Sequence, residues 1–227
     1  MNVIVTGSSS GIGKAIAQRL LADDWNVTGF DVARASIEHE RFTPQQVDLC
    51  DGAAAEQAAE RAGPVSALVH AAGVLRVGPL GRLDAVDGEL MWRLHVESIA
   101  RIANVVLPAM TRARAGRVVL IGSRVAEGKA GRSQYAATKA ALVALARIWA
   151  AEAIAAGVTV NVVSPAATET AMLDDPARKS EAPVLPPIGR LIKPGEIAAL
   201  VAFLLSPAAG AITGQEIQIC GGSSLPR

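Results

Sequence analysis

The side chains with the clearest chemical potential are a tyrosine and a lysine four positions apart. Tyr135, the only tyrosine of the chain, and Lys139 lie in a stretch with a helical pattern, so both fall on one helix face. A phenol is a poor base at neutral pH, but a nearby ammonium favours the phenolate. Ser123 follows a predicted strand, where its hydroxyl could polarise a carbonyl. These residues predict proton transfer to or from an alcohol or carbonyl oxygen.

A glycine-rich segment supports this prediction, because a tyrosine–lysine pair on its own is more often a pair of surface side chains. The segment Thr6-Gly-Ser-Ser-Ser-Gly-Ile-Gly13 follows the first predicted strand and opens the first predicted helix. Glycines there allow a tight turn and let a pyrophosphate approach the N–H groups at the helix start. A plain glycine turn is the alternative. The placement after a strand and before a helix favours a dinucleotide site.

The end of the second predicted strand indicates which dinucleotide would bind. Asp31 lies eighteen positions after Gly13, and a carboxylate there can accept hydrogen bonds from the adenosine ribose hydroxyls. It would also repel a 2′-phosphate, so the sequence predicts NAD in preference to NADP. A capping or turn aspartate is the alternative reading, and Arg34 is the only nearby cation that argues for NADP.

Short apolar runs alternate with longer helical patterns over most of the chain. This alternation predicts βαβ units and an α/β, Rossmann-type doubly wound fold, a seven-stranded mostly parallel sheet flanked by helices on both faces. We expect Asp48 to end the third strand and the segment from His70 to Gly73 to end the fourth, both at the ligand-binding edge. The predicted strands are 3–6, 26–31, 45–49, 67–70, 117–121, 159–163 and 216–219, and the predicted helices are 12–22, 52–62, 90–112, 134–156 and 195–205.

Composition excludes several other classes of protein. The 227 residues carry a formal charge of +1, which gives no electrostatic footprint for nucleic acid or for an anionic membrane surface. The length predicts one domain over residues 1–227, and the proline-rich stretch 170–193 predicts a substrate loop or lid, with a disordered excursion as the alternative. The sequence has two cysteines, no apolar run long enough to span a membrane and no visible secretory signal, so we expect a cytoplasmic protein. We expect no metal site.

Taken together, these motifs resemble those of the short-chain dehydrogenase/reductase family, and the match covers nearly the whole chain. The resemblance rests on the Thr6–Gly13 motif, Asp31, Ser123 and the Tyr135–Lys139 pair, together with Asp48-Leu49, Ala72-Gly73, Asn161 to Pro165, Thr170, Gly189-Arg190, Pro194 and Glu196. It implies a nicotinamide cofactor, Tyr135 as general acid/base, Ser123 as the donor that orients a carbonyl, and Lys139 as ribose ligand and pKa modifier. It also implies a homodimer or homotetramer.

The same resemblance assigns cofactor contacts residue by residue. The segment from Pro165 to Thr170 would lie against the nicotinamide carboxamide, with Thr170 as a donor to the cofactor. The full set of implied contacts is Gly7, Ser9, Ser10, Gly11, Ile12, Gly13, Asp31, Asp48, Leu49, Ala71, Ala72, Gly73, Tyr135, Lys139, Pro165, Ala167, Thr168 and Thr170.

Four departures from the family pattern affect these expectations. The family usually has two asparagines where this chain has His70-Ala71, and its fourth catalytic member, an asparagine, corresponds to His95. We interpret His95 either as a proton relay acting through water or as a packing histidine. Twelve positions separate Ser123 from Tyr135, one fewer than usual, and Ala166 stands where glycine is common. The departures bear on the proton relay more than on hydride transfer.

The sequence thus predicts an NAD-dependent oxidoreductase that interconverts a small secondary alcohol and a ketone, or an alcohol and an aldehyde. Two alternatives remain: an NADPH-dependent 3-oxoacyl-thioester reductase, and a non-catalytic nicotinamide-binding sensor or assembly protein. The substrate is a small molecule whose identity the sequence leaves open. The expected pocket wall carries cations that suit an anionic substrate but also fit an ordinary charged surface, namely Arg76, Arg124, Lys129 and Arg132.

Overall fold

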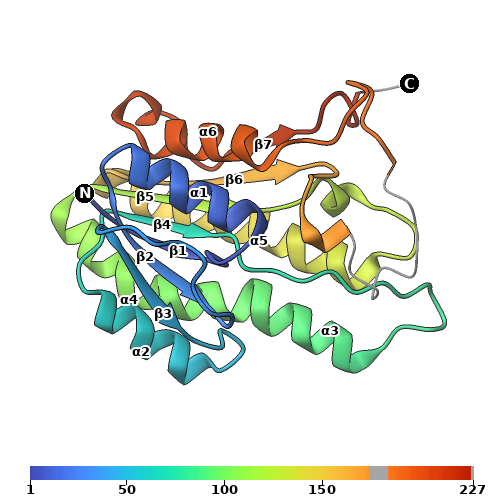
Figure 1. Ribbon diagram of the computed structural model, residues 1–227, viewed down its shortest axis with the longest axis horizontal. Helices are drawn as coiled ribbons and strands as arrows, with labels where there is room; N and C mark the ends of the chain where they lie inside the picture. The colour runs from blue at the N-terminus through green and yellow to red at the C-terminus, as the bar shows by residue number, and fades with distance from the viewer. Residues whose placement is uncertain (174–183, 226–227) are drawn as a thin grey trace.

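A computed structural model describes residues 1–173 and 184–225 and is built around one seven-stranded sheet (Figure 1). All six strand pairs are parallel, in the order β3-β2-β1-β4-β5-β6-β7. The order reverses between β1 and β4, which opens a crevice at the carboxyl ends of the strands. The strands are β1 (Asn2–Thr6), β2 (Asn26–Asp31), β3 (Phe42–Gln46), β4 (Ala67–His70), β5 (Gly116–Ile121), β6 (Val158–Pro165) and β7 (Glu216–Ile219).

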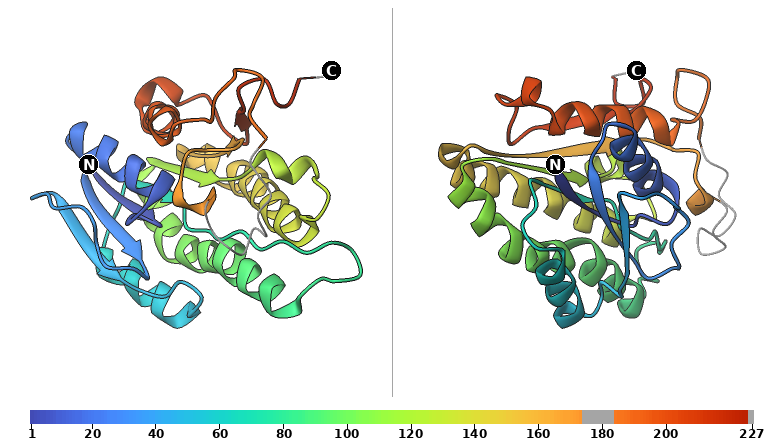
Figure 2. Two further views of the ribbon diagram at one scale, coloured as in Figure 1. Left: turned by 45° about the vertical axis from the view of Figure 1, so that its right-hand side comes forward. Right: turned by 60° about the vertical axis from the view of Figure 1, so that its left-hand side comes forward.

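Helices cover both faces of this sheet (Figure 2). One face packs against α1 (Gly11–Ala22) and α6 (Pro194–Leu205), and the other against α2 (Gly52–Ala62), α4 (Ser98–Ala113) and α5 (Ser133–Ala153). In β1, Val3 and Val5 belong to the core on the face of α1 and α6, and Ile4 belongs to the core on the face of α2, α4 and α5. Because both faces of each central strand are buried, these strands are apolar at nearly every position.

The predicted elements agree with the observed ones along most of the chain, with two corrections. The long predicted helix 90–112 starts earlier, as α3 (Ala85–Trp92), and contains a π-helical turn, η1 (Arg93–Glu97), before α4. The third strand lies three residues earlier than predicted, so Asp48 follows β3 instead of ending it. The prediction was displaced because Val47 and Leu49 are apolar and buried although they follow the strand, whereas β3 itself is an edge strand that tolerates Pro44 and exposed side chains.

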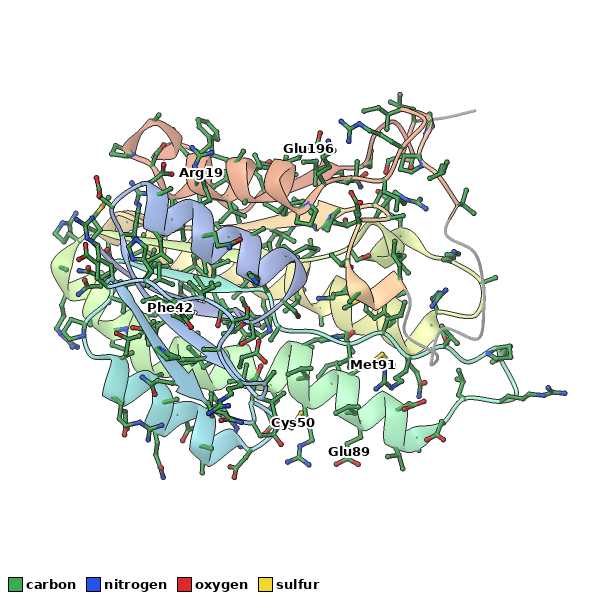
Figure 3. All side chains as sticks on the ribbon, viewed as in Figure 1. Arg19, Phe42, Cys50, Glu89, Met91 and Glu196 are labelled. Atoms are coloured by element: carbon green, nitrogen blue, oxygen red, sulfur yellow. The ribbon has the colours of Figure 1, made fainter. Side chains whose placement is uncertain are left out.

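Phe42 attaches this edge strand to the core (Figure 3). Its side chain is buried, and its ring occupies the space above Gly29 of β2, where an added Cβ would lie 2.5 Å from the ring edge. The glycine therefore creates the room that the aromatic ring fills.

Gly13 allows α1 to lie directly against the end of β1. A Cβ at this position would lie 2.1 Å from the carbonyl oxygen of Gly7, closer than any side chain can approach. Gly7 itself has φ of +69°, a conformation that glycine adopts at little cost. The start of α1 is thereby fixed at the crevice edge, where the glycine motif predicted it.

Two shorter turns complete the crevice: the 3₁₀ helix η2 (Arg124–Glu127) after β5, and η4 (Ala171–Leu173) after β6. Much of the predicted lid, 174–183, lies outside the described residues. Among the helices of the described chain, none combines the length and the apolar character that crossing a membrane requires.

Candidate active site

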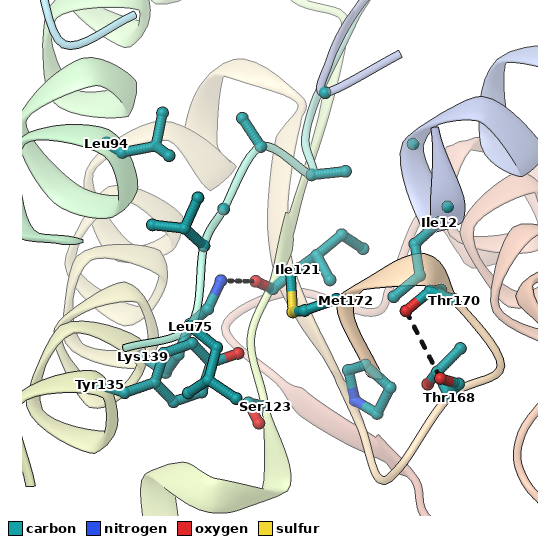
Figure 4. A pocket seen from close by; sticks show the side chains of 18 of the residues that line it. Ile12, Leu75, Leu94, Ile121, Ser123, Tyr135, Lys139, Thr168, Thr170 and Met172 are labelled. Atoms are coloured by element: carbon teal, nitrogen blue, oxygen red, sulfur yellow. Dashed lines mark hydrogen bonds between the residues drawn. The ribbon is translucent and has the colours of Figure 1, made fainter. Parts of the chain in front are cut away.

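A cleft of about 520 Å³ runs along the carboxyl ends of the strands (Figure 4). Residues from the ends of β1, β2, β4, β5 and β6 line it, together with the start of α1 and the first turns of α5. This size falls within the range of small-molecule and cofactor sites. Segments far apart in sequence meet here because parallel strands present all their carboxyl ends at one edge.

The cleft brings together nearly every site residue that the sequence predicted. Ser123, Tyr135 and Lys139 line it, and so do all of the predicted cofactor contacts except Ser9, namely Gly7, Ser10, Gly11, Ile12, Gly13, Asp31, Asp48, Leu49, Ala71, Ala72, Gly73, Pro165, Ala167, Thr168 and Thr170. Ser9 lines a smaller neighbouring cavity, and His95 is fully buried behind the cleft wall.

Several lining residues were not predicted from the sequence. Leu75, Leu94 and Met172 are apolar, and Ser223 belongs to no motif, so only their position in the fold brings these residues to the cleft. The apolar positions that follow Gly73 could have pointed to Leu75. No sequence signal connects Ser223, near the end of the chain, with a cleft whose other described lining residues lie between Gly7 and Leu185.

One end of the cleft suits a dinucleotide. The N-cap residue of α1, Ser10, makes no side-chain hydrogen bond to the helix start, so the first N–H groups are available to a phosphate. Asp31 lies at the end of β2, where Oδ2 accepts the Ser9 N–H at 2.8 Å and Oδ1 accepts the Ala33 N–H at 2.9 Å. Each carboxylate oxygen keeps a further lone pair, which a ribose hydroxyl can use. The residues present therefore fit a nicotinamide dinucleotide.

A threonine–histidine contact fixes the floor of the cleft. The Thr6 hydroxyl oxygen accepts the N–H groups of Ala71 and Ala72 at 3.1 and 3.0 Å. Its hydrogen is therefore directed to His70 Nδ1, 2.9 Å away. This arrangement joins β1 to β4 and holds the Ala71–Gly73 backbone in place. His70 and Ala71 stand where the family pattern places asparagine.

Ser123, Tyr135 and Lys139 meet at the other end of the cleft (Figure 4). The Ser123 oxygen accepts the Val125 N–H at 3.2 Å, so its hydrogen can donate into the cleft. The Lys139 Nζ donates to the Ile121 carbonyl at 2.9 Å and lies 5.8 Å from the centre of the Tyr135 ring. All three residues are buried. The arrangement places a hydroxyl donor, a phenol and an ammonium around one volume.

His95 supports this set from behind. Its Nε2 accepts the Val74 N–H at 3.0 Å, and its Nδ1 lies 2.8 Å from the Thr138 hydroxyl, which donates to the Tyr135 carbonyl at 2.8 Å. Because Nε2 is an acceptor, the proton must reside on Nδ1. The imidazole also meets the Tyr135 ring edge-on, with ring centres 5.7 Å apart. Both ring nitrogens are thus engaged within the protein.

Burial makes Lys139 the dominant charge in this region. Desolvation lowers the pKa of Lys139 from 10.5 to about 8, and burial together with the Lys139 charge lowers the pKa of His70 to about 3. The pKa of His95 is depressed well below its usual value, first by burial and then by the charges of Lys139 and His70. Near neutral pH, the ammonium is therefore flanked by two uncharged imidazoles.

The fold and this constellation define a nicotinamide-dependent oxidoreductase, and the chain belongs to the short-chain dehydrogenase/reductase family. Residues 7–224 match the family model described as enoyl-(acyl carrier protein) reductase. The chain is 34% identical to the 3-oxoacyl-[acyl-carrier-protein] reductase FabG of Salmonella typhimurium, over 96% of this chain and 95% of that protein.

Solved structures give the same result. A short chain dehydrogenase/reductase family protein superimposes with a TM-score of 0.87 at 32% identity, covering 98% of this chain and 96% of the other. A variant of the actinorhodin polyketide ketoreductase, solved with NADPH, superimposes with a TM-score of 0.88 at 27% identity, covering 97% and 96%. The predicted family, the doubly wound fold and an oxidoreductase acting on CH–OH groups are confirmed.

The buried ammonium of Lys139 should cost stability at neutral pH. The folded state has a pKa of about 8 against 10.5 ordinarily, a difference worth about 3 kcal/mol at ~1.4 kcal/mol per pKa unit. Below pH 8 both states carry the charge and the cost is complete. Between about pH 8 and 10.5 the unfolded chain binds the extra proton, so stability rises with pH and the cost disappears.

We therefore expect Lys139→Met to raise the free energy of unfolding by about 1–2 kcal/mol near pH 7, because the lost donor to the Ile121 carbonyl offsets part of the gain. The advantage should shrink as pH rises above 8. Urea unfolding at several pH values measures it, with the exposed Lys129→Met as the matched control. A variant destabilised equally at every pH would contradict the electrostatic cost.

Proposed function

We propose that the protein is an NAD-dependent oxidoreductase that interconverts a small secondary alcohol and a ketone, or a primary alcohol and an aldehyde. The observation that carries this proposal is the placement of Ser123, Tyr135 and Lys139 in the same cleft as Asp31. The first three residues have the chemistry for proton transfer at an alcohol oxygen. The carboxylate has the chemistry to distinguish a ribose hydroxyl from a phosphate.

We assign the cofactor to the half of the cleft formed by the glycine segment, Asp31 and the Ala71–Gly73 backbone. The start of α1 would hold the pyrophosphate and Lys139 the nicotinamide ribose. When bound, the nicotinamide supplies or accepts the hydride, which is chemistry that no described side chain of this cleft can perform. The chain's own residues contribute orientation and proton transfer.

In the oxidative direction, the phenolate oxygen of Tyr135 accepts the substrate hydroxyl proton as the carbinol carbon gives up its hydride. The Ser123 hydroxyl donates a hydrogen bond to the oxygen as it becomes a carbonyl. Lys139 provides the positive charge that favours the phenolate, and its bond to the Ile121 carbonyl fixes where that charge lies. Reduction runs the same transfers backwards, with the phenol as the acid.

His95 acts in this scheme as a positioning residue. Its ring nitrogens bind the Val74 N–H and the Thr138 hydroxyl, and through Thr138 they reach the carbonyl of Tyr135. Both ring nitrogens are engaged within the protein, and the imidazole stays neutral in the pH range where a histidine ordinarily titrates. It therefore does not take up and release a proton for a water chain there. The packing interpretation of His95 is therefore the one that we propose.

The relatives favour a second candidate, an NADPH-dependent 3-oxoacyl-thioester reductase. The relative from Salmonella typhimurium is named as a 3-oxoacyl-[acyl-carrier-protein] reductase, and the ketoreductase structure contains NADPH. Arg34, which lines the small cavity beside Asp31, is the residue that a 2′-phosphate would need. The Asp31 carboxylate opposes this candidate, because it would face that phosphate.

Replacing the phenol tests the proton-transfer step. We expect Tyr135→Phe to lower kcat by about 10²–10⁴-fold, the usual contribution of general acid–base catalysis, while NADH affinity stays within about twofold. Oxidation of NADH with a panel of small ketones and aldehydes measures the first quantity, and nicotinamide fluorescence the second. Substantial turnover by the variant would refute the mechanism. Inactivity of the wild type towards the whole panel with either cofactor would favour a non-catalytic sensor.

Parallel titration with NADH and NADPH tests the role of Asp31. We expect wild-type protein to bind NADH at least about tenfold more tightly, and Asp31→Ser to remove most of that preference, since charge repulsion of this size is worth about 1.4 kcal/mol. Asp23→Ser, in an exposed ion pair with Arg19, is the control. Tighter NADPH binding by the wild type would overturn the NAD assignment and support the thioester reductase.

The pH–rate profile distinguishes the two interpretations of His95. We expect His95→Asn to keep kcat/KM within about tenfold and to leave the profile unchanged in shape between about pH 5.5 and 8, because the imidazole carries no charge there. His39→Asn, at an exposed histidine, is the matched control. A limb of the profile that shifts only in the His95 variant would establish a relay role instead.

A further inference from the structure

The loop between β3 and α2, residues 47–51, forms part of the cleft. Residues 48–50 of this β3–α2 loop line the cleft, and β3 lies next to β2, whose last residue is Asp31. Ser123 and Tyr135 instead follow β5 and lie on α5, on the other side of β1 and β4. The loop therefore belongs to the end of the cleft that we assign to the adenosine of the cofactor.

The sheet supports this loop from one side. In the described part of the chain β3 is the edge of the sheet, so no further strand lies beyond it. The Val47 N–H donates to the Asp31 carbonyl at 2.8 Å, and Leu49 is buried in the core. Within the loop, the Asp48 carboxylate accepts the Cys50 N–H at 2.9 Å. Support for the outer side of the loop must come from another element.

Two arginines of the helix that runs from α3 through η1 into α4 provide this support. The Arg93 guanidinium donates to the Cys50 carbonyl, and Figure 3 shows Cys50 beside this helix. Further along the same helix, Arg101 donates to the Glu56 carboxylate of α2 at 2.9 Å. The Arg101 side chain also lies directly against Gly52, where an added Cβ would be 2.4 Å from its Nε. The helix is thus joined to the loop and to the start of α2.

The π-helical turn gives Arg93 a fixed starting point. His95 is fully buried with both ring nitrogens engaged, and the Ser98 hydroxyl donates to the Leu94 carbonyl at 2.7 Å. The Arg93 side chain stays at the surface, 45% exposed, with the Glu89 carboxylate 3.7 Å away. Because the buried side of the turn is anchored, an arginine on its surface can hold the loop in one position.

A guanidinium is well suited to this task. A charged donor forms a stronger hydrogen bond to a carbonyl than a neutral donor does, and the planar fork of an arginine carries several donors. Neither Arg93 nor Arg101 is among the described residues that line the cleft. Their effect on a bound ligand must therefore act through the loop, whose backbone and side chains do line it.

We propose that Arg93 and Arg101 are positioning residues for the cofactor, which hold the β3–α2 loop where it meets the adenosine. The inference rests on the proposed function, because it assumes that a nicotinamide dinucleotide occupies the cleft with its adenosine at this end. It makes affinity for the adenosine part of the cofactor depend on two side chains that lie outside the cleft.

Binding of NADH and of reduced nicotinamide mononucleotide, which lacks the adenosine, tests the proposal, with nicotinamide fluorescence as the readout. We expect Arg93→Met to weaken NADH binding by about 3–10-fold and to leave mononucleotide binding within about twofold. Arg101→Met should act in the same direction, and Arg93→Lys, which keeps a charged donor, should retain part of the affinity. Arg112→Met, at an exposed arginine in the last turn of α4, is the matched control and should change neither ligand.

Hydrogen exchange without cofactor shows whether the loop itself responds. Amides of residues 48–52 should exchange several-fold faster in Arg93→Met than in wild-type protein, while those of β1 stay unchanged. Unchanged NADH affinity in both methionine variants would overturn the proposal, and so would equal weakening of both ligands or unchanged exchange in the loop. Failure of wild-type protein to bind NADH would instead refute the proposed function.

Discussion

The arrangement of the site depends on one buried ammonium. Lys139 lies almost wholly out of water, and its Nζ donates to the Ile121 carbonyl at the end of β5. Removing an ammonium from water costs free energy, so its surroundings must tolerate a positive charge without adding another. Burial first, and the Lys139 charge second, lower the pKa values of His70 and His95 and so keep both imidazoles neutral. The phenol of Tyr135 lies near the same charge.

The sheet makes this placement possible. With helices on both faces, the central strands bury the side chains along their length, and only their carboxyl ends can present functional groups. Thr6 uses that edge to connect β1 with β4, while Ser123 and Lys139 meet at the end of β5. The stability of the core and the position of the site therefore follow from the same parallel packing.

The sequence was a good guide wherever a local rule had a single structural outcome. The glycine segment, Asp31 and the Tyr135–Lys139 spacing predicted the cleft correctly because a strand–turn–helix start and an i, i+4 pair leave little freedom. The third strand was misplaced because an edge strand need not be apolar. The π-helical turn around His95 and the burial of Arg132 could not be predicted, since both result from contacts between distant segments.

The two histidines show how a site can depart from its family pattern and remain coherent. At the family's asparagine positions the chain has His70 and His95, each with a ring nitrogen that accepts a hydrogen bond and a proton fixed on the other nitrogen. A charged imidazole at either place would oppose the Lys139 ammonium. The depressed pKa values remove that conflict, so both imidazoles leave the Lys139 ammonium near Tyr135 unopposed by a second positive charge from a histidine. In the proposed mechanism, proton transfer at the substrate oxygen then depends on Tyr135 and Lys139, while Ser123 orients that oxygen.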